Sequence, residues 1–187
     1  MWQPENVKIQ GKEMRFEDVP DEELAGTQSV WVMTKDNPWH GFEDMEDDYA
    51  MLDPIKLTFT TPGIDNLGTL AKEGIPANIV TNYLIDKGIV CEKTDYYSFL
   101  LLNSLGTTKG KQGTLLAELF KFKELYDTNA PLCEVFPEMV DAYPETYSGV
   151  GLKDHCNGIH NYFREHKILD SMQAAFTVIP DQVLRPA

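Results

Sequence analysis

Alternating and helical patterns of apolar residues divide the middle of the chain into strands and helices. Residues 55–60 alternate apolar with polar side chains and end at Thr61-Pro62-Gly63, which predicts a strand followed by a turn. A one-sided helix is predicted next, because Pro76 is placed in its first turn and Gly88 stops it. Its apolar face consists of Ile75, Ile79, Val80, Tyr83 and Leu84.

Two further strands and a longer helix are predicted after this point. Residues 89–91 and 97–102 are apolar runs, and the second is apolar on both faces, which is typical of a central strand. Thr107 and Thr108 can cap the helix that follows. That helix carries apolar residues on one side, namely Leu115, Leu116, Leu119, Phe120 and Tyr126. Nearer the N-terminus, residues 29–33 are predicted as a short strand and residues 37–42 as an aromatic turn that covers apolar surface.

The pattern changes near residue 130, where shorter helical pieces are broken by Pro137 and Pro144. One more amphipathic helix carries Leu152, Cys156, Ile159 and Phe163, and the apolar pattern ends at residues 177–180. The order of elements predicts an α+β fold with helices packed on a sheet, and a domain boundary near residue 130.

Charge disfavours one class of function. The 187 residues hold 16 Lys and Arg against 30 Asp and Glu, a net charge of −14, so little basic surface is available for nucleic acid. The first 50 residues alone hold 13 acidic and 4 basic side chains. Their two acidic runs, at 17–23 and 43–48, are predicted to be solvated loops, and the second lacks the residue order of a calcium loop.

Composition and motifs also indicate the cellular compartment and disfavour some kinds of metal and phosphate site. No apolar run approaches the roughly 20 residues of a membrane helix, and the N-terminus has no secretory pattern. The three cysteines are far apart, which disfavours disulfides and a thiolate zinc site, so a cytoplasmic protein is expected. Residues 106–111 share only Gly and Lys with a phosphate-binding loop. His155 and His160 lie about 140° apart around a helix, so we expect them to be peripheral and not to share a metal.

Glu92 is the carboxylate with the strongest case for a binding role. It lies between two predicted strands, where a half-buried carboxylate would suit a cationic ligand, because ion pairing offsets the cost of desolvation. A solvated turn in which Glu92 neighbours Lys93 is the alternative that the spacing also allows.

Several separate motifs follow one another along essentially the whole chain: Trp2-Gln3-Pro4-Glu5, Trp39-His40-Gly41-Phe42, Met51-Leu52-Asp53-Pro54-Ile55-Lys56-Leu57, Thr61-Pro62-Gly63-Ile64, Gly74-Ile75-Pro76-Ala77, Gly88-Ile89-Val90-Cys91-Glu92-Lys93-Thr94, Lys121-Phe122-Lys123 and Tyr143-Pro144-Glu145-Thr146-Tyr147. Together and in register, they resemble the motifs of the bacterial ornithine/lysine/arginine decarboxylases. The resemblance implies a pyridoxal-phosphate enzyme of the aspartate-aminotransferase fold type. It implies that residues 1–129 are the small domain of that architecture with an acidic N-terminal linker region, and that residues 130–187 begin a mixed α/β C-terminal domain.

The resemblance implies that no cofactor-binding or catalytic residue lies in this chain. The family's cofactor lysine belongs to a Ser-x-His-Lys motif in a large domain outside it. Glu165-His166-Lys167 contains His-Lys, but Arg164 stands where the serine would be. The expected parent reaction is α-decarboxylation to a diamine or agmatine, and the pyridoxal ring takes up the electron pair.

Substrate recognition is the part of that reaction that the resemblance assigns to this chain. A glutamate of the Glu-Lys motif faces the distal ammonium in the lysine and ornithine members, and it maps onto Glu92. The stretch from Trp31 to Phe42 is instead more similar to the arginine members, so lysine or ornithine is favoured and arginine stays the alternative. Trp39 and His40 suit a binding role or a structural role. Pro131 and Glu134 are poor material for the nucleotide alarmone that regulates some lysine members.

Two other functions stay open at this level. The first is a stand-alone interaction domain on the same fold, in which the acidic N-terminal quarter binds a basic partner. The second is a transaminase-like enzyme, which should carry an arginine for the substrate's α-carboxylate, yet Arg15, Arg164 and Arg185 are the only three arginines. The family resemblance implies a homo-oligomer with active sites at the interface.

Overall fold

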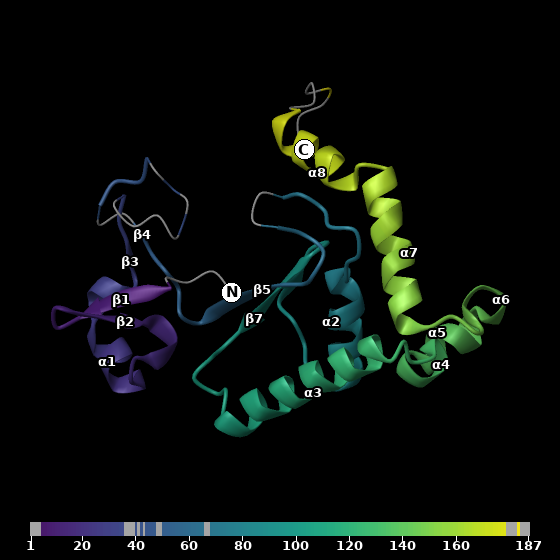
Figure 1. Cartoon of the computed structure of the whole chain (residues 1–187), viewed down its shortest axis with the longest axis horizontal. Coiled ribbons are helices and arrows are strands. Elements are labelled where there is room, and N and C mark those ends of the chain that lie inside the picture. The colour runs from purple at the N-terminus through teal and green to yellow at the C-terminus, as the bar shows by residue number, and fades with distance from the viewer. Residues whose placement is uncertain are drawn as a thin grey trace. The chain divides into compact units, whose positions relative to one another are not determined.

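The computed structural model describes residues 5–35, 40, 42, 44–47, 50–65, 68–178 and 183, and the chain divides into two compact units (Figure 1). Unit 1 consists of residues 1–59 and 100–107, and unit 2 of residues 60–99 and 108–187. The mixture of helices with small sheets confirms the predicted α+β composition. Within the described residues, no helix combines the length and the apolar composition that crossing a membrane requires.

Unit 1 begins with a hairpin that the sequence patterns did not predict. β1 (Asn6–Ile9) pairs antiparallel with β2 (Lys12–Arg15) through a two-residue turn. Gln10 and Gly11 both have positive φ, at 49° and 84°, as this kind of tight hairpin turn requires. The hairpin contributes the buried side chains of Val7 and Ile9, which form a small core with Val19 and Val30.

Short helical elements complete this core. The first acidic run forms the turn η1 (Phe16–Asp18) and the helix α1 (Asp21–Gly26), so it is helical and not the predicted loop. η2 (Gln28–Val30) and β3 (Val32–Met33) replace the predicted strand at 29–33, and β3 pairs with β4 (Ala50–Met51). Trp31 donates its indole N–H to the carbonyl of Leu24, which ties η2 to α1.

A three-stranded sheet has the order β5-β7-β6, with β5 at Lys56–Thr60, β7 at Ser98–Leu102 and β6 at Lys93–Thr94. Thr61 bonds to Tyr97 at one end of the β5–β7 pair and Asn103 bonds to Ile55 at the other, so these strands run in opposite directions. The predicted strand at 55–60 and the predicted central strand at 97–102 are both confirmed.

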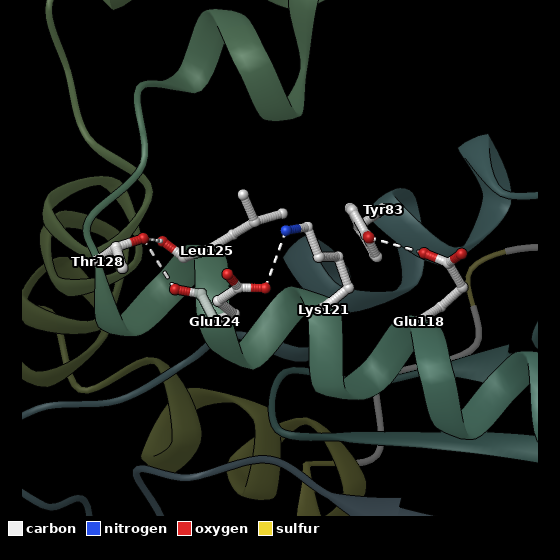
Figure 2. A network of polar contacts seen from close by, with 6 residues as sticks. All are labelled: Tyr83, Glu118, Lys121, Glu124, Leu125 and Thr128. Carbon is white, nitrogen blue, oxygen red and sulfur yellow. Dashed lines mark hydrogen bonds and ion pairs between the residues drawn. The ribbon is translucent and has the colours of Figure 1, made fainter.

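In unit 2, α2 (Ala77–Asp86) packs against α3 (Lys109–Asp127). Pro76, which was predicted in the first turn, lies immediately before α2. The predicted threonine cap is confirmed at Thr108, whose hydroxyl accepts the amide N–H of Lys111. Tyr83 of α2 donates a hydrogen bond to Glu118 of α3 at 2.8 Å (Figure 2). The ring of Tyr83 also packs on Phe122. The side of α3 that is buried differs from the prediction, because Phe122 is 4% exposed whereas Leu116 and Phe120 are 56% and 63% exposed.

The second half of unit 2 is helical. The short helices α4 (Leu132–Val135), α5 (Pro137–Ala142) and α6 (Pro144–Tyr147) begin after Pro131, Phe136 and Tyr143, as the proline pattern predicted. The predicted amphipathic helix is α7 (Leu152–Glu165), and it is followed by α8 (Ile168–Thr177), which the sequence patterns did not predict. Lys167 lies between α7 and α8 and has a φ of 48°, so α7 ends before it, as expected.

Asn129 joins α3 to α7. Its side-chain oxygen accepts the amide N–H groups of Lys153 and Asp154 at 2.9 and 3.2 Å, which caps the start of α7. The amide of Leu152 donates to the carbonyl of Ala130, and the amide of Leu132 donates to the carbonyl of Val150. The side-chain bonds of Asn129 cross the predicted boundary at 129/130, which stays a prediction, whereas these two backbone bonds lie on its C-terminal side.

Candidate functional site

Glu92 lies in the connection between α2 and β6, and its side chain is exposed. The preceding residues were predicted to be a strand, and this is wrong. Gly88 has a φ of 77° and the amide of Ile89 bonds back to Leu84, so the backbone closes α2 and does not pair with a strand. Val90 is 77% exposed and Cys91 is half-buried, and pairing begins only at β6.

The surroundings of Glu92 leave its carboxylate accessible from solvent. Among the described residues, Glu92 makes no hydrogen bond or ion pair. The turn just beyond it is ordered, because Asp95 donates its amide N–H to Ser98 and its side chain accepts the amide N–H of Tyr96. This arrangement favours the solvated-turn alternative for this chain by itself, and it leaves the Glu92 carboxylate able to accept a cation.

A buried tyrosine–histidine pair anchors the strand that follows this turn. Tyr97, just before β7, is 4% exposed, and His160 of α7 is fully buried. The two side chains bond at 2.6 Å between the Tyr97 hydroxyl and Nδ1, and Nε2 lies 2.9 Å from the carbonyl of Ala71. A carbonyl can only accept, so Nε2 carries the proton, and Nδ1 accepts from Tyr97.

His160 therefore corrects the expectation that both histidines are peripheral. His160 is buried because two polar groups satisfy its ring nitrogens, whereas His155 is only half-buried and lies against Tyr147. The spacing of the two histidines does not show this difference, since the partners Tyr97 and Ala71 are 63 and 89 positions away in sequence.

Two glycines of the resemblance motifs lie against this histidine. A Cβ on Gly74 would lie 2.3 Å from Nδ1 of His160, and a Cβ on Gly63 would lie 2.6 Å from the Cα of Gly74. Gly63 also has a φ of 120°, which disfavours any other residue. The glycines are thus required so that the segment between β5 and α2 can cross closely over α7.

Burial raises the pKa of two groups in this part of the chain, Tyr97 of the anchor and Cys91 beside Glu92. It raises the pKa of Tyr97 to about 12, and the guanidinium of Arg164 opposes part of the rise. Burial also raises the pKa of the Cys91 thiol, next to Glu92. Thr61, at the end of β5, has a buried hydroxyl oxygen that no described residue satisfies.

The lysines of the chain do not suit a pyridoxal-phosphate Schiff base. Twelve of the thirteen, Lys167 of the His-Lys pair included, are exposed at the surface, and the half-buried Lys153 pairs with Glu73 at 3.3 Å. A Schiff-base lysine must instead lie in a cleft that excludes water. In the part of the chain that the structure describes, no group of three His, Cys, Asp or Glu side chains is placed to hold a metal ion.

The other candidate residues are used within the fold. His40 is 1% exposed, and its Nε2 bonds to the carbonyl of Thr34 while its Nδ1 accepts the amide of Phe42, which favours its structural role. Trp39 lies outside the described residues. The segment 106–111 leads into α3 and contains its cap, so it is the start of a helix and not a phosphate-binding loop.

Comparison with known proteins gives the same family that the motifs resemble. The family model described as "Orn/Lys/Arg decarboxylase, major domain" matches residues 1–111. The chain is 45% identical over 170 residues to the lysine decarboxylase LdcA of Pseudomonas aeruginosa, covering 89% of this chain and 23% of that protein. It is 38% identical over 176 residues to the biodegradative arginine decarboxylase of Escherichia coli, covering 94% of this chain and 23% of that protein.

A solved structure shares both sequence and fold. Lysine decarboxylase A from Pseudomonas aeruginosa superimposes with a TM-score of 0.79 at 42% identity, over 96% of this chain and 23% of that one. The chain thus spans about a quarter of the length of the relatives it matches.

Proposed function

Because the chain belongs to the Orn/Lys/Arg decarboxylase family, we propose that it is a part of a pyridoxal-phosphate-dependent decarboxylase of a basic amino acid. Lysine or ornithine is the favoured substrate, which would give cadaverine or putrescine and carbon dioxide, and arginine is the alternative. The relatives named above are lysine and arginine decarboxylases, which supports a basic amino acid without choosing among them.

The proposal assigns recognition and assembly, and not cofactor chemistry, to this chain. Residues 1–129 would be the aminotransferase-like small domain and residues 130–187 the start of the C-terminal domain, in a cytoplasmic homo-oligomer. The matching family model, which is described as that of the major domain, covers residues 1–111 and thus lies wholly within the proposed 1–129 domain. Pyridoxal phosphate, when bound elsewhere in the enzyme, acts as the electron sink of the reaction.

The observation that carries the proposal is the exposed, unpaired carboxylate of Glu92 within the segment that the family model matches. In a full-length enzyme this carboxylate would accept the distal ammonium of lysine or ornithine. A charge-assisted hydrogen bond of this kind contributes about 1.5–3 kcal/mol.

Replacing Glu92 tests this role. In the full-length enzyme, Glu92→Gln should lower kcat/KM for lysine and ornithine by about 10- to 100-fold, mainly through KM, because a neutral amide pairs weakly with an ammonium. Asp86→Asn is the matched control, since Asp86 is an exposed carboxylate at the end of α2. Decarboxylation of lysine, ornithine and arginine is followed by carbon dioxide release. Unchanged selectivity and KM in Glu92→Gln would reject the role of Glu92. A full-length enzyme that prefers arginine would reject lysine or ornithine as the favoured substrate.

A further inference from the structure

A shallow pocket of about 460 Å³ lies between α6 and the face of α7, away from Glu92 in the chain. Its volume is in the range of small-molecule sites. The pocket is lined by side chains from α6, from α7 and from the connection between them, among them Tyr147, Val150, Asp154, His155, Ile159 and Tyr162. In Figure 1, α5 and α6 lie beside the N-terminal end of α7.

The walls of the pocket are apolar and aromatic. Val150 and Ile159 supply aliphatic surface, and Tyr147 and Tyr162 supply aromatic rings. His155 lies edge-on to Tyr147 with ring centroids 5.5 Å apart, and burial lowers its pKa below the usual range. The imidazole of His155 is therefore held toward its neutral form.

The charged component of the pocket is negative, because Asp154 is the one carboxylate among the described residues that line it. Residues 124–152, which include α4, α5 and α6, contain six further acidic side chains and no Lys, Arg or His, and none of the six lines the pocket. At the pocket itself, the carboxylate of Asp154 is held in place by the side-chain amide of Asn129, which donates to it at 2.8 Å. The neighbouring Lys153 pairs with Glu73 at 3.3 Å and lies 5.7 Å from the ring of Tyr126, so its charge is engaged elsewhere.

We propose that this pocket binds an organic cation with an aliphatic spacer, an α,ω-diamine of the kind that the proposed reaction produces. The choice of a diamine rests on the proposed function, whereas the chemistry of the pocket stands without it. One ammonium pairs with Asp154 and lies over a tyrosine ring, and the methylene chain packs on Val150 and Ile159. The acidic surface attracts a dication and repels the carboxylate of the amino-acid substrate, so the pocket selects product over substrate.

Titration of the full 187-residue chain with cadaverine tests this site. We expect saturable shifts in the side-chain NMR signals of Tyr147 and Tyr162, about tenfold weaker binding of pentylamine, which lacks the second cation, and weaker binding again of lysine. Asp154→Asn and Tyr147→Leu should each weaken cadaverine binding about tenfold. Asp154→Asn leaves an amide oxygen that can still accept from Asn129, so the helix start is kept.

Asp86→Asn is the matched control, because it removes an exposed negative charge at the end of α2, outside the pocket and outside residues 124–152, and should leave the affinity unchanged. Unshifted signals of Tyr97 and His160 report that each variant is folded. Absence of saturable shifts at these tyrosines, or equal affinity in Asp154→Asn and the unaltered chain, would overturn the proposal. The Glu92 assay is independent of these titrations, so failure of the pocket and failure of the proposed function give different results.

Discussion

At the residue scale, the contact between Gly74 and His160 gives a test of how closely the segment before α2 packs. Gly74→Ala places a methyl group 2.3 Å from Nδ1 and 2.6 Å from Cε1 of a histidine that is fully buried. The ring cannot move without breaking its hydrogen bonds to Tyr97 and Ala71. We expect Gly74→Ala to lower the free energy of unfolding by about 2–4 kcal/mol, measured by urea denaturation.

Gly113→Ala is the control for this residue. Gly113 lies in the interior of α3, where a Cβ would meet no atom within 4 Å. The same substitution there should raise the stability by about 0.5–1 kcal/mol, since alanine favours the helix. Equal changes in the free energy of unfolding at the two positions would show that the close contact at Gly74 does not affect stability.

At the element scale, Asn129 caps α7 from outside the helix, and its two roles can be separated. Its side chain bonds to the amides of Lys153 and Asp154, and its backbone has a φ of 51°. Asn129→Ala loses both the cap and the residue type that tolerates this conformation, so we expect a loss of about 2–3 kcal/mol in thermal or urea unfolding. Asn129→Gly keeps the conformation and should lose only about 1 kcal/mol. A glycine variant as unstable as the alanine variant would contradict this division.

Elements with a strong local pattern were predictable, and those fixed by distant partners were not. The strand at 55–60 and the helix beginning after Pro76 follow from alternation, helical spacing and capping residues. The hairpin at the start was missed because its strands are only four residues long and mostly exposed, although Val7 and Ile9 alternate beside Gln10-Gly11. No strand forms at 89–91, because the amide of Ile89 bonds to the carbonyl of Leu84 at the end of α2. The prediction that Glu92 lies between two strands rested only on its neighbours in sequence.

At the scale of the whole molecule, several buried acidic groups of unit 2 make the fold sensitive to alkali. Burial raises the pKa of Cys156 and of Tyr97 each to about 12, and burial together with Glu118 raises the pKa of Tyr83. The unfolded chain loses these protons near the ordinary values of 9.0 for the thiol and 10.0 for the phenols, whereas the folded protein keeps them. Stability is therefore fully present below about pH 9 and is lost as the pH rises toward the folded-state pKa values.

Each such group adds a slope of about 1.4 kcal/mol per pH unit once the unfolded form is ionised and while the folded form is not. Urea midpoints followed by circular dichroism from about pH 8 to about pH 11 should fall accordingly. Cys156→Ala should be less stable throughout, because a buried side chain is removed, yet its decline should begin about one pH unit later. Cys133→Ala is the control, since Cys133 is an exposed thiol and should leave the profile unchanged. A profile of Cys156→Ala parallel to that of the unaltered chain would mean that the buried thiol ionises as readily in the folded protein as in the unfolded chain.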